Sequence, residues 1–134
     1  MLKVVVIDAN AISRNLLTSV LVDGGFDVVG DASTSSAGLA AMIKLKPQMV
    51  CIDIGQADAE GFERLDTVRA GLPKTLLFMV SGSFDPAAVQ GAVERGVHGF
   101  IVKPFKSATV LNTIRKTVIK VAYQHRARAG QDAE

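Results

Sequence analysis

Four side chains that could take part in chemistry stand where short apolar runs of the chain end. They are Asp8, Asp53, Ser81 and Lys103. In an open parallel sheet, ligands bind beyond the carboxyl ends of the strands, so we expect these four residues to meet at one edge of one sheet. None of these residue types is expected in a dry core without a partner.

The four residue types supply what the transfer of a phosphoryl group to a carboxylate requires. A pair of carboxylates can hold Mg²⁺, which prefers oxygen ligands and shares them with phosphate. The metal neutralises charge as the phosphoryl group moves. Asp53 can act as the nucleophile, because carboxylates form aspartyl phosphates. Ser81 can donate a hydrogen bond to a phosphoryl oxygen, and Lys103 can pair with Asp53 before transfer and with the phosphate after it.

Short apolar runs alternate with amphipathic stretches along the chain. Strands are expected at 3–8, 26–30, 49–53, 75–80 and 99–102. Helices are expected at 11–23, 33–46, 61–69, from 86 to near 96, and from 107 to about 123. The first run is continuous and β-branched, as is typical of a strand buried on both faces. Glycine and proline follow the helical stretches and end them.

This alternation predicts an α/β fold with a doubly wound parallel sheet of five strands and five helices. Parallel strands need right-handed crossovers, which place helices on both faces. The length of 134 residues fits one domain, which we expect to span residues 1–124. Residues 125–134 are expected to form a polar, frayed tail.

The composition excludes several classes of protein. The net charge of +2 is too small to argue for nucleic acid, and no block of like charge marks a DNA-binding arm. No apolar stretch is long enough to span a bilayer. The single cysteine, Cys51, lies in an apolar run and is expected to be a core residue. We therefore expect a cytoplasmic protein without nucleic-acid or membrane partners.

Motifs at the strand ends resemble those of the receiver domains of bacterial response regulators, with single-domain chemotaxis regulators as the nearest type. The matching stretches are Val5–Asp8, Cys51–Asp53 with Gly61 eight residues later, Met79–Gly82 and Gly99–Phe105. Each motif alone is weak. Together, in this order and at strand ends, they are a strong signal that covers the chain from residue 3 to about residue 120.

The resemblance implies a flavodoxin-like sheet with the strand order 2-1-3-4-5. It implies that Asp53 is the phospho-acceptor and that Ser81 and Lys103 contact the phosphate. Mg²⁺ would be held by Asp8, Asp53 and the backbone carbonyl of Gly55. Ser81 and Phe100 would form the conformational switch, with the aromatic ring moving inward when the hydroxyl moves. The resemblance also implies a cis bond before Pro104.

The same resemblance implies the partners. A sensor histidine kinase would donate the phosphoryl group in a two-component phosphorelay. Output would come from binding a downstream protein through the last helices and the face around Phe100, and a homodimer stays open. Such a domain is not an enzyme in the usual sense, since at most it catalyses its own phosphorylation and dephosphorylation.

The pair Asp8–Ala9 departs from the family, because receivers usually carry two adjacent acids here and the second contacts Mg²⁺ directly. Ala9 cannot ligate a metal, so a weakened magnesium site is expected. In one interpretation, Asp8 and Asp53 with waters still bind Mg²⁺, and phosphorylation is retained but slower. In a second, another side chain supplies the missing oxygen: Asn10, Asp58 or Glu60. In a third, the domain is a phosphorylation-independent protein-interaction module.

Each candidate residue also has a purely structural interpretation. Asp53 could stabilise a turn and Asp8 could cap the first helix. Ser81 could stabilise its own turn, Lys103 could be a surface lysine, and Phe100 could be a core residue. A nucleotide- or flavin-binding enzyme of the same topology is disfavoured, because residues 9–13 hold no glycine-rich phosphate cradle.

Overall fold

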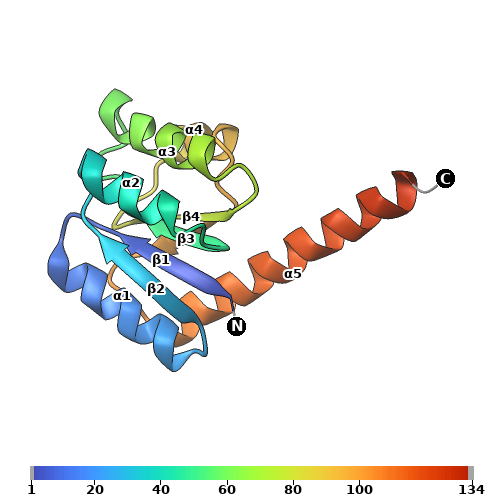
Figure 1. Cartoon of the computed structure of the whole chain (residues 1–134), viewed down its shortest axis with the longest axis horizontal. Helices are drawn as coiled ribbons and strands as arrows, with labels where there is room; N and C mark the ends of the chain where they lie inside the picture. Colours follow the sequence, from blue (N-terminus) through green and yellow to red (C-terminus); the bar gives the residue numbers. More distant parts are fainter. Residues whose placement is uncertain (1, 133–134) are drawn as a thin grey trace.

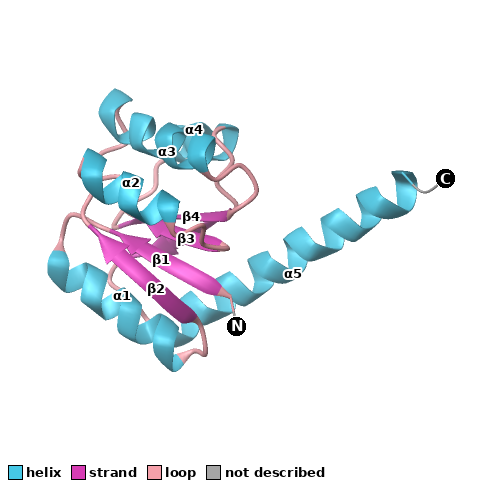
Figure 2. Ribbon diagram, in the orientation of Figure 1, coloured by secondary structure: helices cyan, strands magenta, loops and turns pink. Residues whose placement is uncertain are grey.

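A parallel five-stranded sheet lies at the centre of the chain (Figures 1 and 2). The structure is a computed structural model that describes residues 2–132. Its strands are β1 (Lys3–Ile7), β2 (Asp27–Ala32), β3 (Met49–Ile52), β4 (Leu76–Ser81) and β5 (Gly99–Val102). They are arranged in the order β2-β1-β3-β4-β5, and every neighbouring pair is parallel. The predicted fold class and strand order are confirmed.

Five helices cover the two faces of the sheet. They are α1 (Ala11–Asp23), α2 (Ser36–Lys44), α3 (Ala59–Gly71), α4 (Pro86–Glu94) and α5 (Ser107–Asp132). Helices α1 and α5 pack on one face, whereas α2, α3 and α4 pack on the other (Figure 1). Right-handed crossovers between parallel strands produce this two-sided arrangement.

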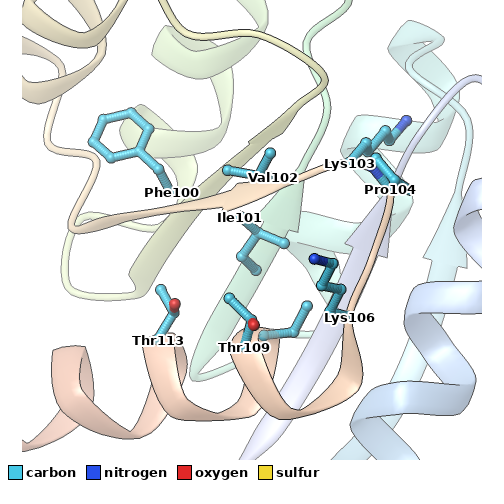
Figure 3. A pocket seen from close by; sticks show the side chains of 9 residues that line it. Phe100, Ile101, Val102, Lys103, Pro104, Lys106, Thr109 and Thr113 are labelled. Atoms are coloured by element: carbon cyan, nitrogen blue, oxygen red, sulfur yellow. The ribbon is translucent and has the colours of Figure 1, made fainter.

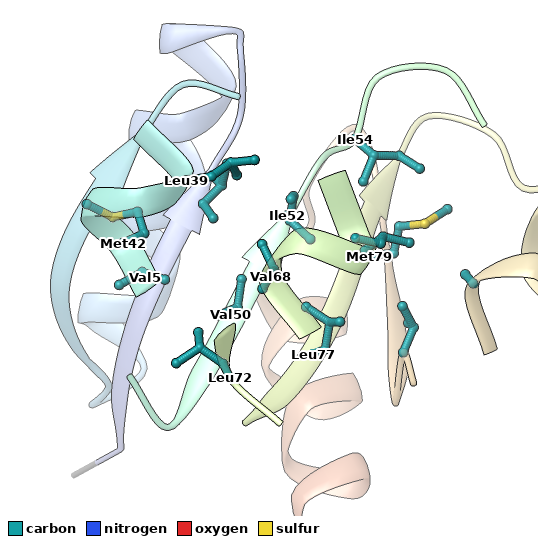
Figure 4. Packing of buried hydrophobic residues seen from close by; sticks show 14 residues of the cluster. Val5, Leu39, Met42, Val50, Ile52, Ile54, Val68, Leu72, Leu77 and Met79 are labelled. Carbon is teal, nitrogen blue, oxygen red and sulfur yellow. The ribbon is translucent and has the colours of Figure 1, made fainter. Parts of the chain in front are cut away.

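Two apolar clusters, one on each face of the sheet, form the core. Alternate residues of β3 point to opposite faces of the sheet. Val50 and Ile52 pack beneath α2 and α3 (Figure 4), whereas Met49 and Cys51 pack toward α1 and α5. All four side chains are fully buried, which explains why this strand reads as a continuous apolar run. Burial raises the pKa of the Cys51 thiol to about 12, consistent with a core role.

Capping side chains set the helix starts and shift them from the expected positions. Ser35 Oγ accepts a hydrogen bond from the Gly38 amide, so α2 begins at Ser36 and not at residue 33. Asp58 Oδ1 accepts from the Gly61 amide, so α3 begins at Ala59 and not at residue 61. Strand β2 is also displaced, running to Ala32 and not to residue 30.

The last helix is longer than expected. Helix α5 continues to Asp132, so the expected end near residue 123 and the frayed tail from residue 125 are wrong for the described residues. Residues 133 and 134 of that tail lie outside the part that the structure describes. The extension holds no proline and one glycine, Gly130, and is otherwise rich in residues that favour helices. Over residues 2–132, no helix has the length and apolar character needed to cross a bilayer.

His98 joins the starts of two strands at the amino edge of the sheet. Its backbone amide donates to the carbonyl of Leu77 at 2.8 Å, and its Nδ1 accepts from the Leu77 amide at 3.1 Å. Partial burial of the ring, and then the positive charge of Arg69, lower the pKa of His98 below its ordinary value of 6.5. The acceptor role of Nδ1 also requires a neutral ring.

We expect this histidine to make stability depend on pH. Because its pKa is lower in the folded chain, the unfolded chain takes up the proton first, and stability present above about pH 6.5 is lost as the pH falls. His98→Asn keeps an acceptor for Leu77 but cannot titrate. Urea unfolding measures the free energy of unfolding between about pH 8 and pH 5.5. This free energy should fall less with decreasing pH in the variant than in the wild type. The matched variant His125→Asn should show the same pH dependence as the wild type. A reduced pH dependence in both variants would contradict the assignment of this effect to His98.

Candidate functional site

An ammonium group bridges two carboxylates at the carboxyl edge of the sheet. Lys103 Nζ lies 2.8 Å from Asp8 Oδ2 and 2.6 Å from Asp53 Oδ2. Asp8 follows β1, Asp53 follows β3, and Lys103 follows β5, so the parallel sheet brings together residues that are far apart in sequence. The exposed fractions of the three side chains are 7%, 16% and 22%. The expectation that these strand ends meet is confirmed.

The two carboxylates hold the lysine in its charged form. Burial alone would lower the pKa of Lys103, but hydrogen bonds and charge attraction from Asp53 and Asp8 outweigh it and raise the pKa above 10.5. Stability contributed by this cluster is therefore present below pH 10.5 and is lost as the pH rises through the raised pKa. Lys103 is not a free surface lysine.

The other oxygen of each carboxylate accepts a backbone hydrogen bond. Asp8 Oδ1 accepts from the Asn10 amide at 2.8 Å, and Asp53 Oδ1 accepts from the Gly55 amide at 2.8 Å. The interpretation of Asp8 as the cap of the first helix is wrong. Asn10 is the cap, because its Oδ1 accepts from the amides of Ile12 and Ser13.

The side chains considered as replacements for the missing acid at Ala9 already have other partners. The oxygen of Asn10 caps α1, and Asp58 Oδ1 caps α3. Glu60 lies 3.4 Å from Arg64 with 79% of its side chain exposed. Among residues 2–132 no group of three or more His, Cys, Asp or Glu side chains is placed to hold a metal. The oxygens of Asp8 and Asp53 suit Mg²⁺ in type, but the set is one carboxylate short.

Ser81 reaches the same edge but bonds within its own turn. Its Oγ donates to the carbonyl of Ser83 at 2.9 Å and accepts from the Ser83 amide at 3.2 Å. Ser81 and Gly55 line a hollow of about 250 Å³ between the loops that follow β3 and β4. Ser81 therefore stabilises its own turn in this structure. It ends β4, which pairs with β3, the strand that Asp53 follows.

Phe100 is partly buried and contacts the loop that follows Ser81. Its ring packs against the core under α3 and α4 and meets Phe84 edge-on, with centroids 5.1 Å apart and planes at 74°. Such aromatic pairs add to the free energy gained by burial. Sequence reasoning missed Phe84, because a single aromatic in a loop has no periodic signal.

Two arginines hold the backbone around the carboxylates, and sequence reasoning missed both. Arg14 Nη1 donates to the carbonyl of Asp8 at 2.7 Å, and its Nε lies 3.0 Å from Asp31 Oδ1. Arg64 Nη1 donates to the carbonyl of Ile54 at 2.6 Å. Each guanidinium fixes the chain at or next to one acid. Their distance along the sequence from those acids matches no motif, so only the structure identifies them.

Two glycines shape the loop after Asp53. Gly55 has a φ of +83°, a conformation that glycine adopts without strain. A Cβ at Gly61 would lie 2.0 Å from the carbonyl oxygen of Gln56, so only glycine allows the loop to pack this closely on α3. This steric need explains the glycine eight residues after Asp53.

Two grooves flank the loop after β5, where the bond between Lys103 and Pro104 is cis, as expected. One, of about 550 Å³, lies between α1 and this loop and is lined by Ser13, Leu16, Val20, Lys103, Pro104, Phe105 and Ser107. The other, of about 420 Å³, lies between β5 and α5 (Figure 3). Phe100, Val102 and Val110 contribute apolar surface to the second groove, and Lys106 lies at its border.

A doubly wound sheet that carries a lysine-bridged pair of aspartates beyond its carboxyl edge defines the receiver class of signalling domain. The model of the response regulator receiver domain family matches residues 4–115. The chain belongs to this family, which serves two-component systems and is a family of signalling domains rather than of classical enzymes.

Similar proteins and structures agree with this assignment. The chemotaxis protein CheY of Listeria monocytogenes is 29% identical over 116 residues, which cover 87% of this chain and 98% of that protein. The response regulator VraR of Staphylococcus aureus is 25% identical, over 87% of this chain and 56% of that protein. The structure of CheY4 from Vibrio cholerae superposes with a TM-score of 0.75 at 27% identity, covering 87% of this chain and 98% of that one.

We expect the lysine bridge to be stabilising in itself. Lys103→Met should lower the free energy of unfolding by about 1–3 kcal/mol at neutral pH, because two largely buried carboxylates lose their counter-charge. Added Mg²⁺ should raise the melting temperature of this variant more than that of the wild type, since the ion can replace the ammonium. Differential scanning calorimetry measures both effects. Lys106→Met, on the same loop but exposed, is the control. An equal loss of unfolding free energy in the two variants would show that the bridge does not stabilise the fold.

Proposed function

We propose that the chain accepts a phosphoryl group on Asp53 from a sensor histidine kinase and signals through a change of conformation and partner binding. The observation that carries this proposal is the contact of Asp53 Oδ2 with Lys103 Nζ, at a partly open sheet edge. An Asp53 oxygen attacks phosphorus, the bond from phosphorus to the donor histidine nitrogen breaks, and that nitrogen keeps the electron pair and takes up a proton. The product is an acyl phosphate, whose charge Lys103 can neutralise.

The switch would involve Ser81, Phe84 and Phe100. For its hydroxyl to bond a phosphoryl oxygen on Asp53, Ser81 must give up its bonds to Ser83. That exchange would move the loop after β4, which carries Phe84. Because Phe84 contacts Phe100 edge-on, displacement of the loop would change the packing of Phe100 on β5. This route would couple the phosphorylated edge to the surface beside β5.

Mg²⁺ would be held by Asp8, Asp53 and the carbonyl of Gly55, with an affinity reduced by Ala9. Receiver domains generally bind this ion at the phosphorylation site. When bound, it neutralises charge on the phosphoryl group. The residues of this chain orient the acceptor: Lys103 holds Oδ2, and the Gly55 amide holds Oδ1.

The two grooves beside Lys103 suit the two partners of a receiver. The phosphodonor would dock against α1, where Ile12 is 74% and Leu16 is 56% exposed, next to the groove that reaches Lys103. The downstream target would bind the groove between β5 and α5, which Phe100 lines (Figure 3). A change at Phe100 would then alter the surface that the target contacts.

A second candidate function is a docking module that works without phosphorylation. Ala9 favours it, because one metal ligand is absent.

Phosphorylation with a small-molecule donor separates the two candidates. The wild type incubated with radiolabelled acetyl phosphate and Mg²⁺ should acquire label, because the donor carries a reactive acyl phosphate and Asp53 is a carboxylate at a partly open edge of the sheet. Asp53→Asn should remain unlabelled, while Asp58→Asn, which changes a nearby acid that caps α3, should still be labelled. An unlabelled wild type would leave the docking module as the function.

We expect Ala9→Asp to strengthen Mg²⁺ binding. The added carboxylate supplies a further negative charge beside Asp8 and Asp53, and an affinity gain of about tenfold or more should follow. A Mg²⁺ titration followed by the NMR shift of the Gly55 amide measures it. Ala9→Asn adds a side chain of the same size as aspartate but without the charge, so its gain in Mg²⁺ affinity should be smaller. Equal affinities of the wild type and Ala9→Asp would show that position 9 does not reach the metal.

A further inference from the structure

The second half of α5 presents a surface that the family match does not include. The match ends at residue 115, whereas α5 continues to Asp132. In Figure 1 this part of the helix projects away from the sheet. The five residues Ala122–Arg126, which point to all sides of the helix, are all exposed. An isolated helical segment of this length is only marginally stable in water, so a partner that packs on it would stabilise it.

An apolar recess lies where this projecting segment leaves the domain. It has a volume of about 280 Å³ and is lined by Leu2, Phe26, Arg115, Val118 and Ile119. Ile119 is 67% exposed, and Tyr123, one turn further along the helix, is 74% exposed. Ile119 and Tyr123 therefore extend the apolar lining of the recess along one side of the helix.

The charged side chains that α5 contributes around this surface are all basic. Between Glu94 and Asp132 the sequence contains no acidic residue, whereas the exposed positions of this part of α5 include Arg115, Lys116, Lys120 and Arg126. On the opposite wall of the recess, Phe26 lies between Asp23 at the end of α1 and Asp27 at the start of β2, so the cluster of basic residues belongs to the helix side. Two copies of α5 placed side by side would bring these like charges together, which disfavours a second copy as the occupant.

We propose that this surface, formed by the recess and the α5 residues from Arg115 to Arg126, binds an acidic amphipathic segment of another protein. A large apolar side chain of that segment would fill the recess between Phe26 and Ile119. Its carboxylates would face the basic residues of α5, which gives charge complementarity. A recess that accepts one protruding side chain suits a protein partner better than a flat lipid surface or a nucleic-acid backbone.

This site is separate from the phosphorylation site. Leu2 precedes β1 and Phe26 precedes β2, so the recess lies at the amino edge of the sheet, opposite the edge that carries Asp53. The proposed segment therefore binds without covering Asp53 or Lys103. The inference does not depend on whether Asp53 accepts phosphate.

The test begins with selection of displayed random peptides on the immobilised full chain. Peptides of about 16 residues are long enough for four helical turns. We expect the enriched sequences to be acidic and to repeat large apolar residues at helical spacing. A synthetic copy of the most enriched peptide, labelled with fluorescein, is then titrated with the full chain and followed by fluorescence anisotropy.

Variants of the full chain locate the binding. Ile119→Glu and Arg115→Glu, both at exposed positions, should each lower the affinity for the peptide by about tenfold or more. Val93→Glu changes an apolar residue on α4 that is also exposed, at 49%, and should leave the affinity unchanged, as should Asp53→Asn. Circular dichroism confirms that each variant is folded.

Four outcomes would overturn the proposal. The first is no enrichment, or enrichment of peptides without net negative charge. The second is equal affinity for the wild type and Ile119→Glu. The third is a wild type that sediments as a dimer while Ile119→Glu is monomeric, which would make a second copy the occupant. The fourth is binding to phosphatidylserine vesicles without binding to the selected peptide, which would indicate a membrane surface.

Discussion

The bridge from Lys103 to Asp8 and Asp53 is the interaction on which the site depends. Two carboxylates that are largely buried repel each other and cost free energy unless a cation lies between them. The sheet order makes the bridge possible, because β1 and β3 are neighbours and β5 lies two strands from β3. The lysine side chain spans that distance from the end of β5. The bridge thus links the two halves of the sheet at the edge where ligands bind.

The same bridge sets the electrostatic balance of the site. Asp8, Asp53 and Lys103 together carry one net negative charge, and a second acid at position 9 would double it. The alanine at position 9 supplies no charge that could attract a divalent cation, while Lys103 partly neutralises Asp8 and Asp53. The contacts of Asp53 with Lys103 and with the Gly55 amide hold this carboxylate in place without any contribution from position 9.

Much of the architecture could be predicted from the sequence, because it depends on local patterns. Buried parallel strands read as continuous apolar runs, and the polar residue after each run marks the carboxyl edge. The convergence of Asp8, Asp53 and Lys103 follows from that rule together with parallel topology. The strand order came from the resemblance to receiver domains and not from periodicity.

The features that sequence analysis missed depend on contacts between distant residues or on details of turns. Arg14 and Arg64 donate to backbone carbonyls, which every residue has, so no partner residue type marks them. The contact of Phe84 with Phe100 joins a loop to a strand. The bonds of Ser81 within its turn depend on the local course of the chain. The extension of α5 to Asp132 also escapes prediction, because a polar composition does not distinguish a solvated helix from a frayed tail.

Backbone NMR of the full chain with beryllofluoride and Mg²⁺ tests whether Asp53 can carry a phosphoryl group, because beryllofluoride occupies the place of that group on an acceptor carboxylate. We expect shifts at Gly55 and Lys103, next to Asp53, and further shifts at Ser81, Phe84 and Phe100, along the proposed switch. It also predicts that Asp53→Asn abolishes all of them. An unchanged spectrum of the wild type at saturating Mg²⁺ would contradict the claim that the lysine-bridged aspartates form a phosphoryl-accepting site.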